Sequence, residues 1–474
     1  MSARRIGFAV GIALFLASIV VPPPANMPRE AWTVAGLVLW MATWWMTQAI
    51  PLTATALLPF LVLPLAGVMT AKDTASAYYD PILFLILGGA FVALAIERTG
   101  LHRKLSLAIL RMIGRGGAGG EMRLLLAFMT SAAALSMLIS NTSTALIMMP
   151  MALAVLAGGG TSGEERDGLT GALPIGIAFA ASIGGLGTII GSPTNGIAVA
   201  LIADLTGTRI SFIEWMAYGV PVVLVGIPLA AFIIAKVQRI AEHPFDVAGA
   251  REAIDDHAPW TTPQRRLLPI IAAAFALWAT QLLVAPILPA NSWTDGTIAI
   301  IAGLSLFVIP DGTGRPLLTW PEADRAPWGV IMMFGGGLAL AAGMGASGLA
   351  EWLGAALLPL SAFPLVLIAL AVVALVIVVT EFASNVATAS AIIPVVASLC
   401  VALGADPVLL AMPAALAASW GFMLPAGTGP NAIAWATGRI HLPRMVGSGV
   451  LLDVAGPLLI VGSVWGAAAV LGYG

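Results

Sequence analysis

Residues 140–150 read SNTSTALIMMP and residues 384–394 read SNVATASAIIP, so the pattern S-N-x-x-T-A-x-x-x-x-P occurs twice with an offset of 244 residues. Each copy interrupts a long apolar stretch with a small polar cluster. In a membrane protein, a polar cluster repeated in both halves is typical of a transporter whose halves build one binding site. The repeat therefore predicts a transporter and not a soluble enzyme.

The composition places most of the chain in lipid. Of its 474 residues, 59% are hydrophobic and only 9% are charged, a balance typical of polytopic membrane proteins. Apolar runs near the length of a membrane-crossing helix predict about eleven spans besides the two Ser-Asn segments. These runs are residues 6–21, 32–50, 53–68, 81–96, 173–190, 215–235, 267–288, 297–309, 330–349, 409–424 and 446–471. The expected fold class is an all-α polytopic membrane protein.

The charge balance and the single cysteine narrow the possible functions. A net charge of −2 gives no reason to expect nucleic acid as a partner. Cys400 is the only cysteine, so an intramolecular disulfide is impossible. The first apolar run follows Arg4 and Arg5, but the VPPPANMP after it offers no small-x-small cleavage site. We expect an uncleaved first helix with a cytoplasmic N-terminus, in the inner (plasma) membrane.

The longest polar stretch, residues 236–266, divides the chain into two halves. It mixes acidic and basic side chains, which is typical of a solvated linker. We expect it to be a cytoplasmic linker between an N-terminal half, residues 1–235, and a C-terminal half, residues 267–474.

Basic residues indicate that the two halves have opposite orientations. Residues 98–123 are rich in lysine and arginine, whereas residues 348–380 have none. Because basic residues of short loops stay in the cytoplasm, the first segment should lie inside and the second outside. Gly-Gly pairs at 88–89 and 336–337 precede these segments with an offset of 248. Glycine pairs are also common where membrane helices pack closely, but two echoes in the same order predict inverted repeats.

Each Ser-Asn motif lies in an apolar segment that is too long for one span and too short for two. The first covers about residues 124–157 and the second about residues 364–403. We expect two re-entrant hairpins, the first entering from the cytoplasm and the second from outside, with the motifs at tips near the bilayer midplane. Irregular backbone at that depth is tolerated only where it is buried in protein or lines a cavity.

A second interruption follows each hairpin. Residues 184–195 read GGLGTIIGSPTN and residues 424–431 read LPAGTGPN. Proline frees carbonyl groups, and glycine permits the torsions that turn carbonyls toward a cation. Such loops can coordinate sodium without a carboxylate.

The candidate site has no basic residues: no lysine or arginine lies between Gly168 and Asp204 or between Asn385 and Gly438. An anion would therefore be held by asparagine amides, hydroxyls, helix N-termini and bound cations; a neutral substrate would fit the same absence. Serine, threonine and asparagine also join membrane helices without forming a site. The duplication, the hairpin length and the broken loops favour a site.

At these residues the chain resembles the divalent anion/sodium symporter family, transporters of succinate-like dicarboxylates, citrate and sulfate. The Ser-Asn motifs carry the resemblance, with DPILFLILGGAFVALAIERTGLHRK at residues 80–104 and LTWPEADRAPWGVIMMFGGGLALA at residues 318–341. It covers essentially the whole chain. The resemblance implies a homodimer in which each subunit has a scaffold domain and an elevator-type transport domain containing both hairpins.

The same resemblance implies which residues bind ions and substrate. One sodium site would use Ser136, Ser140, Asn141 and Gly191, and a second would use Thr380, Ala383, Asn385 and Gly427. Substrate would contact the tips and the second broken loop at Asn141, Thr142, Ser384, Asn385, Val386 and Thr428. Sodium ions are then co-transported, and no organic cofactor is implied.

Two positions depart from the common family pattern. Val386 stands where the second motif usually has threonine, and Gly429 stands where the loop often has proline. The missing hydroxyl at 386 removes one carboxylate donor, so the second tip is where selectivity would differ. Glu381 is the one carboxylate beside that tip, and an intramembrane acid is a functional candidate; support of the sodium site is favoured over a proton relay.

We expect a sodium-coupled symporter of C4-dicarboxylates such as succinate, malate or fumarate. A sulfate or citrate symporter and a sodium-independent dicarboxylate exchanger stay open. An ion channel would not need hairpins entering from both sides. An intramembrane enzyme would need a catalytic pair or a metal cluster, but none of the four histidines lies in a hairpin or broken loop.

Overall fold

The computed structural model describes residues 3–114, 120–160, 166–243, 245–247, 249 and 259–472. These residues form helices and their connections, and the β pairing within them is one isolated bridge between Pro310 and Pro316. Seven helices of the described ranges are long and apolar enough to cross a membrane, or eight if a bent pair counts as one span. The all-α membrane class is confirmed.

The candidate spans and the shorter apolar helices together cover most of the expected spans. The long apolar helices are α6 (Ile82–Thr99), α9 (Asn141–Gly158), α12 (Phe212–Val237), α18 (Trp328–Ala346), α20 (Leu365–Phe382), α21 (Asn385–Leu403) and α24 (Leu442–Leu471). The shorter apolar segments are Leu52–Leu65, Leu169–Gly185, Asp295–Val308, Leu349–Ala362 and Pro407–Ala417. Length and hydropathy do not distinguish a span from a hairpin arm, so the total of about eleven spans stays a prediction.

One order of elements occurs twice along the chain: a glycine-paired helix, a shorter helix, two hairpin arms, a buried helix, a break, a short helix and a long last helix. The first half has α6, α7 (Leu101–Gly114), α8 (Gly120–Ser136), α9, α10 (Leu169–Gly185), α11 (Pro193–Thr206) and α12. The second half has α18, α19 (Leu349–Leu357), α20, α21, α22 (Pro407–Ala417), α23 (Gly429–Ala436) and α24.

The other helices lead into each half. The first half begins with α1 (Ala3–Val20), α2 (Arg29–Thr47), α3 (Leu52–Thr55), α4 (Leu58–Leu65) and α5 (Ala71–Ala77). The second begins with α14 (Thr262–Ala279), α15 (Gln281–Val284), α16 (Asp295–Val308) and α17 (Trp320–Ala323). Within the described ranges, the short 3-10 turns are η1 (Ile189–Gly191), η2 (Ile240–Glu242), η3 (Ala285–Ile287) and η4 (Leu358–Ala362).

The serine of each Ser-Asn motif starts the second arm of a hairpin. Ser140 accepts a hydrogen bond from the backbone N–H of Ser143 at 3.2 Å, and Ser384 accepts one from that of Ala387 at 3.2 Å. A serine in this N-cap position satisfies an N–H group that the helix itself leaves free. The motif therefore sets where α9 and α21 begin, and the arms span 120–158 and 365–403.

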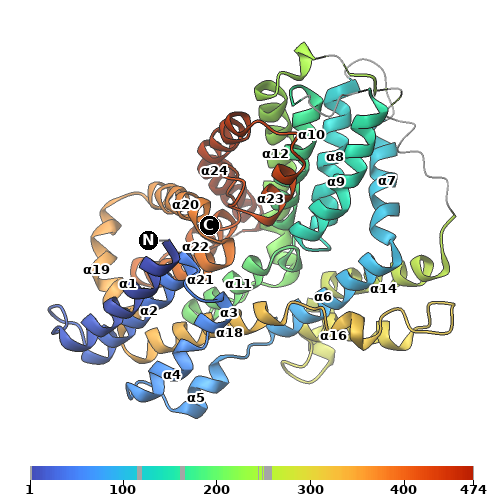
Figure 1. Cartoon of the computed structure of the whole chain (residues 1–474). Helices are drawn as coiled ribbons and strands as arrows, with labels where there is room; N and C mark the ends of the chain where they lie inside the picture. Colours follow the sequence, from blue (N-terminus) through green and yellow to red (C-terminus); the bar gives the residue numbers. More distant parts are fainter. Residues whose placement is uncertain are drawn as a thin grey trace.

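The second arm of each hairpin packs against the broken helix of the other half. α9 contacts α23, and α21 contacts α11. Figure 1 shows α23 beside α9 and α10. All residues of α10 are buried, chiefly beneath α8, α9, α12 and α23. Each half thus supplies support for the hairpin of the other.

The glycine pairs allow helices to approach closely. A β-carbon at Gly88 of α6 would lie 2.4 Å from the carbonyl carbon of Ala299 on α16. One at Gly336 of α18 would lie 2.4 Å from the carbonyl oxygen of Ala56, just after α3. Any larger residue would force these helices apart. The repeated glycines therefore serve packing between equivalent pairs of helices.

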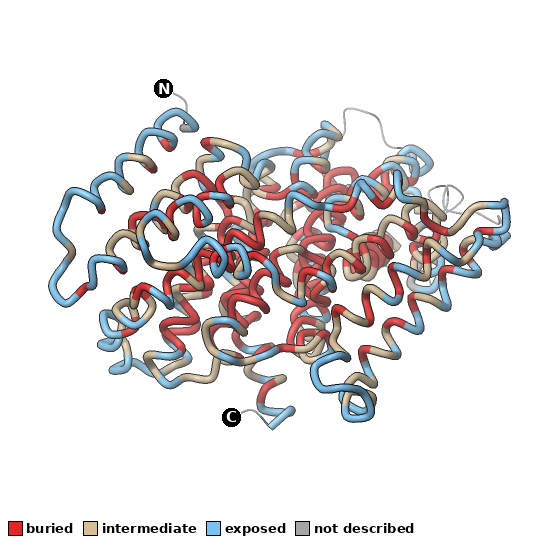
Figure 2. The backbone as a smooth tube through the Cα atoms, turned by 90° about the horizontal axis from the view of Figure 1, so that it is seen from below, coloured by how far each residue is buried: buried red, intermediate tan, exposed pale blue. Residues whose placement is uncertain are grey.

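The molecule has a buried centre and an apolar outer surface. Figure 2 shows buried residues running through the middle, with exposed residues along the outer helices and at both ends of the chain. The exposed surface of α12 and α24 carries large hydrophobic side chains such as Leu224, Val454 and Leu458. Apolar patches of this kind are costly in water and suit contact with lipid.

Arg98, in the last turn of α6, joins the first half to the second. Its guanidinium donates to the carbonyl of Leu317 at 2.5 Å and forms ion pairs with Asp311 and, at 3.3 Å, with Glu322. The Asp311 side chain is only 2% exposed. Hydrogen bonds from the Thr313 side chain and from Arg98 hold the pKa of Asp311 well below its ordinary value.

Replacing Asp311 with asparagine should destabilise the protein, because Arg98 loses its buried partner. We expect the apparent Tm in detergent to fall by roughly 3 to 6 °C at neutral pH. A depressed pKa stabilises the fold above the ordinary carboxyl value of about 3.9 and ceases to do so as the pH falls through the folded value. The difference between Asp311→Asn and the parent should therefore shrink in acid.

The control is Glu242→Gln, since the ion pair of Glu242 with Arg239 is 3.8 Å long and more than half exposed on both sides. Such pairs contribute little, so the Tm should not change. An equal loss in both variants would contradict the assignment of Arg98 as a link between the halves.

Candidate functional site

The first Ser-Asn tip brings together polar groups from four elements, α8, α9, α10 and η1. Ser136, the last residue of α8, donates its hydroxyl to the carbonyl of Ala181 on α10 at 2.6 Å. One end of the Asn141 carboxamide lies 2.7 Å from the same hydroxyl, 3.2 Å from the Ala181 carbonyl oxygen and 3.1 Å from the Gly191 carbonyl oxygen. We call these four groups the first oxygen cluster.

The first oxygen cluster can be satisfied in two ways. If the carboxamide nitrogen of Asn141 occupies the shared end, it donates to the three surrounding oxygens. If the carboxamide oxygen occupies it, four oxygens face one another with one hydroxyl proton among them, and a cation between them would satisfy the arrangement. Hydroxyl, amide and carbonyl oxygens are the ligands of hard cations. The oxygens of the cluster therefore fit a sodium ion.

Glycines make room for the first oxygen cluster. A β-carbon at Gly185 would lie 2.2 Å from the carboxamide oxygen of Asn141. One at Gly191 would lie 2.8 Å from the backbone carbonyl oxygen of Ser136. A side chain at either position would fill the space among the ligand atoms. The first broken loop therefore needs glycine at both places.

Side chains of the first broken loop hold its irregular backbone in place. Asn195 donates its amide to the carbonyl of Gly185 at 2.7 Å and to that of Thr188 at 2.8 Å. The Thr188 hydroxyl donates to the carbonyl of Met137 at 2.6 Å, which ties the loop to the hairpin tip. Buried backbone groups freed by the break are thus satisfied by side chains.

The second tip repeats the arrangement as the second oxygen cluster. The Thr380 hydroxyl lies 2.7 Å from the carbonyl oxygen of Ala418 and 3.0 Å from the carboxamide oxygen of Asn385. Thr380 and Asn385 keep the 244-residue offset from Ser136 and Asn141. The hydroxyl again has one proton for two oxygens. Both tips therefore present the same chemistry to a cation.

The remaining predicted sodium ligands lie close to the clusters in different roles. Ser140 uses its side-chain oxygen to cap α9. Ala383 is the buried C-cap of α20, and its N–H donates to the carbonyl of Val379 at 3.1 Å. Gly427 packs on the second tip, since a β-carbon there would lie 3.6 Å from the carbonyl oxygen of Glu381. The structure thus joins both broken loops to the hairpins that precede them.

The sequence did not point to the carbonyls of Ala181 and Ala418, although each receives the hydroxyl of its tip. Each alanine stands three residues before a glycine, Gly184 or Gly421. A β-carbon at Gly184 would lie 2.4 Å from the Ala133 backbone, so the glycine lets the hairpin arm reach this carbonyl. The shared Ala-x-x-Gly spacing is the signal that could have found them.

Glu381 holds the second broken loop in position. Its carboxylate oxygens accept hydrogen bonds from the backbone N–H of Met423 at 2.9 Å and of Leu424 at 3.2 Å. Asp453 on α24 is buried near Glu381, and neither of its carboxyl oxygens has a hydrogen-bond partner among the described residues. Asp453 was not predicted from the sequence, because its position in an apolar run was its only distinguishing feature.

Two helix N-termini meet at the first tip. α9 begins at Asn141, and α23 begins at Gly429 behind its N-cap, Thr428. A β-carbon at Gly429 would lie 2.4 Å from the hydroxyl oxygen of Thr142. Helix N-termini carry partial positive charge and free N–H groups. Gly429 stands where the family often has proline, and the reason is space, because glycine leaves room for the Thr142 hydroxyl.

Several hydroxyl groups at the hairpin tips and the second broken loop can donate a hydrogen bond to a ligand. Within the described ranges, no protein acceptor takes the hydroxyl proton of Ser140, Thr142, Ser384 or Thr428, whereas that of Thr188 is used by Met137. Val386 differs from Thr142, since it is half-buried and packs on the hydrophobic core. The first tip and the second loop therefore offer the donors that a carboxylate needs.

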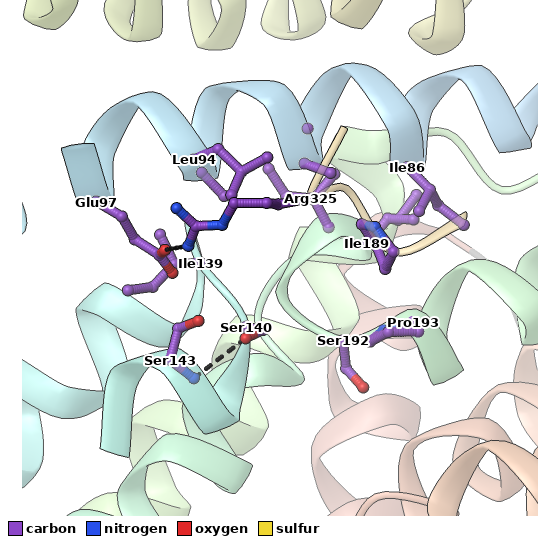
Figure 3. A pocket seen from close by; sticks show the side chains of 15 residues that line it. Ile86, Leu94, Glu97, Ile139, Ser140, Ser143, Ile189, Ser192, Pro193 and Arg325 are labelled. Atoms are coloured by element: carbon purple, nitrogen blue, oxygen red, sulfur yellow. Dashed lines mark hydrogen bonds and ion pairs between the residues drawn. The ribbon is translucent and has the colours of Figure 1, made fainter. Parts of the chain in front are cut away.

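A cavity of about 250 Å³ opens beside the first tip. Figure 3 shows Ser140 and Ser143 on one side of it and Glu97 with Arg325 on the other. Its further lining comes from α6, the first broken loop and the segment before α18, and it does not include Asn141 or Thr142. The cavity thus flanks the tip and is distinct from the junction of α9 and α23.

The comparisons with known proteins agree on one family. The family described as "Sodium:sulfate symporter transmembrane region" matches residues 3–471. The sodium-dependent dicarboxylate transporter SdcS of Staphylococcus aureus strain bovine RF122 / ET3-1 is 37% identical over 97% of this chain and 90% of its own. The protein of the same name from strain MSSA476 is 36% identical over the same shares.

Two solved structures share the fold. The YdaH transporter of Alcanivorax borkumensis matches with a TM-score of 0.59 and 16% identity, over 94% of this chain and 99% of its own. MtrF of Neisseria gonorrhoeae matches with a TM-score of 0.55 and 12% identity, over 98% and 94%. These similarities concern the arrangement of the helices alone.

Replacing Ser136 with alanine should weaken sodium binding, because the first oxygen cluster loses its hydroxyl. We expect the rise in Tm that sodium chloride produces over potassium chloride to need about tenfold more sodium, or to vanish. Ser182→Ala is the matched control, since Ser182 adjoins Ala181 and its buried hydroxyl has no partner in the described structure. A normal sodium response in Ser136→Ala would remove this cluster from consideration.

Proposed function

The chain belongs to the sodium:sulfate symporter family, and from that membership we propose that it is a sodium-coupled symporter of C4-dicarboxylates such as succinate, malate or fumarate. Relatives at 36 to 37% identity bear the name of sodium-dependent dicarboxylate transporter, which supports both the ion and the substrate class. The family consists of membrane transporters and not of enzymes.

The observation that carries the proposal is the junction of α9 and α23 between the two oxygen clusters. The Thr142 and Thr428 hydroxyls and two helix N-termini face an anion there, and the chain places no basic residue on α9 or α23. Cations in the clusters would supply the positive charge that basic side chains do not provide at this junction. Sodium therefore completes the anion site, and its departure weakens that site.

Charge balance sets the driving force. A succinate-like anion brings two negative charges, so more than two sodium ions per substrate move net positive charge. Each such charge gains about 2.3 kcal/mol per 100 mV when it moves toward a negative interior. Accumulation against a gradient would then draw on both the sodium gradient and the membrane potential.

We propose further that α8 to α12 and α20 to α24 form the transport domain of an elevator-type homodimer. The contacts of α9 with α23 and of α21 with α11 support this division, because they join both hairpins into one body. The basic residues of 98–123 support a cytoplasmic position for the end of α6. By the same rule the N-terminus lies in the cytoplasm and the halves are inverted across the inner membrane.

Sulfate is the second candidate substrate, since the family description names it. A tetrahedral dianion also suits helix N-termini and hydroxyl donors. Citrate and sodium-independent dicarboxylate exchange are the further alternatives. These choices differ in the anion and in the need for sodium, which one transport assay separates.

Proteoliposomes with an inward sodium gradient should accumulate labelled succinate, and an inside-negative potential should increase the uptake. Unlabelled malate and fumarate should compete, while sulfate and citrate should compete weakly. Protein-free vesicles and vesicles with sodium replaced by choline are the controls. Uptake of equal rate without sodium would refute the coupling, and preferential uptake of sulfate would refute the substrate.

Replacing Thr142 with valine should raise the KM for succinate about tenfold, because one hydrogen bond to a charged carboxylate is lost. The sodium dependence of the Tm should be unchanged. Thr144→Val, on the same helix, is the matched control, since the buried Thr144 hydroxyl has no partner among the described residues. Equal KM values in the two variants would exclude Thr142 as a substrate ligand.

A further inference from the structure

The cavity beside the first tip contains a feature that the junction of α9 and α23 lacks, a basic side chain. Arg325 lies in the segment before α18 and is the one basic residue that lines this cavity. Serine hydroxyls of the tip, Ser140 and Ser143, line the opposite wall (Figure 3). At about 250 Å³, the cavity has room for a small anion with water, since a water molecule takes about 30 Å³.

Arg325 is paired with Glu97 of α6, but the pair is poorly held. Their closest atoms are 3.7 Å apart, and the Arg325 and Glu97 side chains are 68% and 25% exposed. Ion pairs of this kind are weak. A carboxylate that enters the cavity can therefore replace Glu97 on the guanidinium at little cost, and Glu97 can displace it again.

Neighbouring charges leave Arg325 available. The adjacent Arg98 is committed to Asp311 and Glu322. Glu322 is also held by Arg315 at 2.5 Å. Within the described structure, Glu97 is thus the acidic side chain that forms an ion pair with Arg325.

The pair occurs on only one side of the repeat. At the repeat offset of 248 residues, Glu97 corresponds to the uncharged Gly345, and the segment before α6, AYYD at residues 77–80, has no basic residue. The second hairpin therefore has no equivalent guanidinium in this position. Any role of Arg325 is therefore confined to the end of α6 that precedes the basic segment.

We propose that this cavity is a second, transient binding station for the transported carboxylate, with Arg325 as its basic ligand and Glu97 as the competing acid. The station rests on the proposed function and adds a site to it. Ser140 belongs to both places, since it adjoins Asn141 at the tip and lines the cavity. An anion leaving the tip exchanges its helix N-terminus for Arg325, and Glu97 then returns to the arginine as the anion departs into the cytoplasm.

The two members of the pair should have opposite effects on transport. In inside-out vesicles, which expose the cytoplasmic face, Arg325→Gln should raise the KM for succinate by about threefold or more, and Glu97→Gln should lower it by a similar factor. In right-side-out vesicles both KM values should stay near that of the parent. Arg265→Gln, which removes an exposed charge at the start of α14, should leave the KM unchanged.

A purely structural ion pair would respond differently. Loss of either partner would then shift the KM in the same direction and lower the Tm alike. Such a result would overturn the station, as would an unchanged cytoplasmic KM in Arg325→Gln.

A labelling experiment tests the station without transport. Cys400 is buried, so a maleimide should react chiefly with the thiol of a Ser143→Cys variant in the cavity wall. Succinate or sulfate should slow this reaction, and the added change Arg325→Gln should abolish the protection. Protection that persists without Arg325 would refute the proposal. If the parent protein does not transport succinate, the proposed function is wrong. Protection of the introduced thiol from maleimide by sulfate or citrate would still show that an anion binds in the cavity.

Discussion

Breaks in buried helices are the constraint on which the rest of the structure depends. A helix that stops inside the protein leaves backbone carbonyls and N–H groups that water cannot reach. Here Asn195, Thr188 and Glu381 satisfy those groups around the two broken loops. The carbonyls of Ala181 and Ala418 meet the tip hydroxyls instead. The irregular backbone that folding must satisfy is therefore the same backbone that offers oxygen to a cation.

The two halves share a hydroxyl and carboxamide pair but differ in the other side chains at their tips. Ser136 with Asn141 and Thr380 with Asn385 build equivalent hydroxyl and carboxamide pairs. The anion donors are unevenly divided, because Thr142 faces Gly429 whereas Val386 packs on the core. The hydroxyl and carboxamide pair is therefore common to both halves, whereas the polar groups at the position after the asparagine differ between them.

Much of the fold and part of the site could be predicted from the chain. Composition and apolar run length gave the membrane class, and the Ser-Asn repeat located both tips within a few residues. The hydroxyl and carboxamide groups of the two clusters could be predicted, because the residue type specifies the chemistry of a side chain. The carbonyl groups of Ala181 and Ala418, which accept the tip hydroxyls, could not be predicted, because every residue has a carbonyl and only tertiary packing brings a particular one to the tip.

The sequence by itself determined where helices begin and break, because N-cap serines, glycines and prolines act over a few residues. It also determined that the site lacks basic side chains. Only the tertiary structure decided that α23 contacts α9, that Asp453 is buried near Glu381, and that Arg325 pairs with Glu97. These contacts join residues tens to hundreds of positions apart, and their partners are selected by how closely glycine-lined helices can pack, a property of the assembled fold.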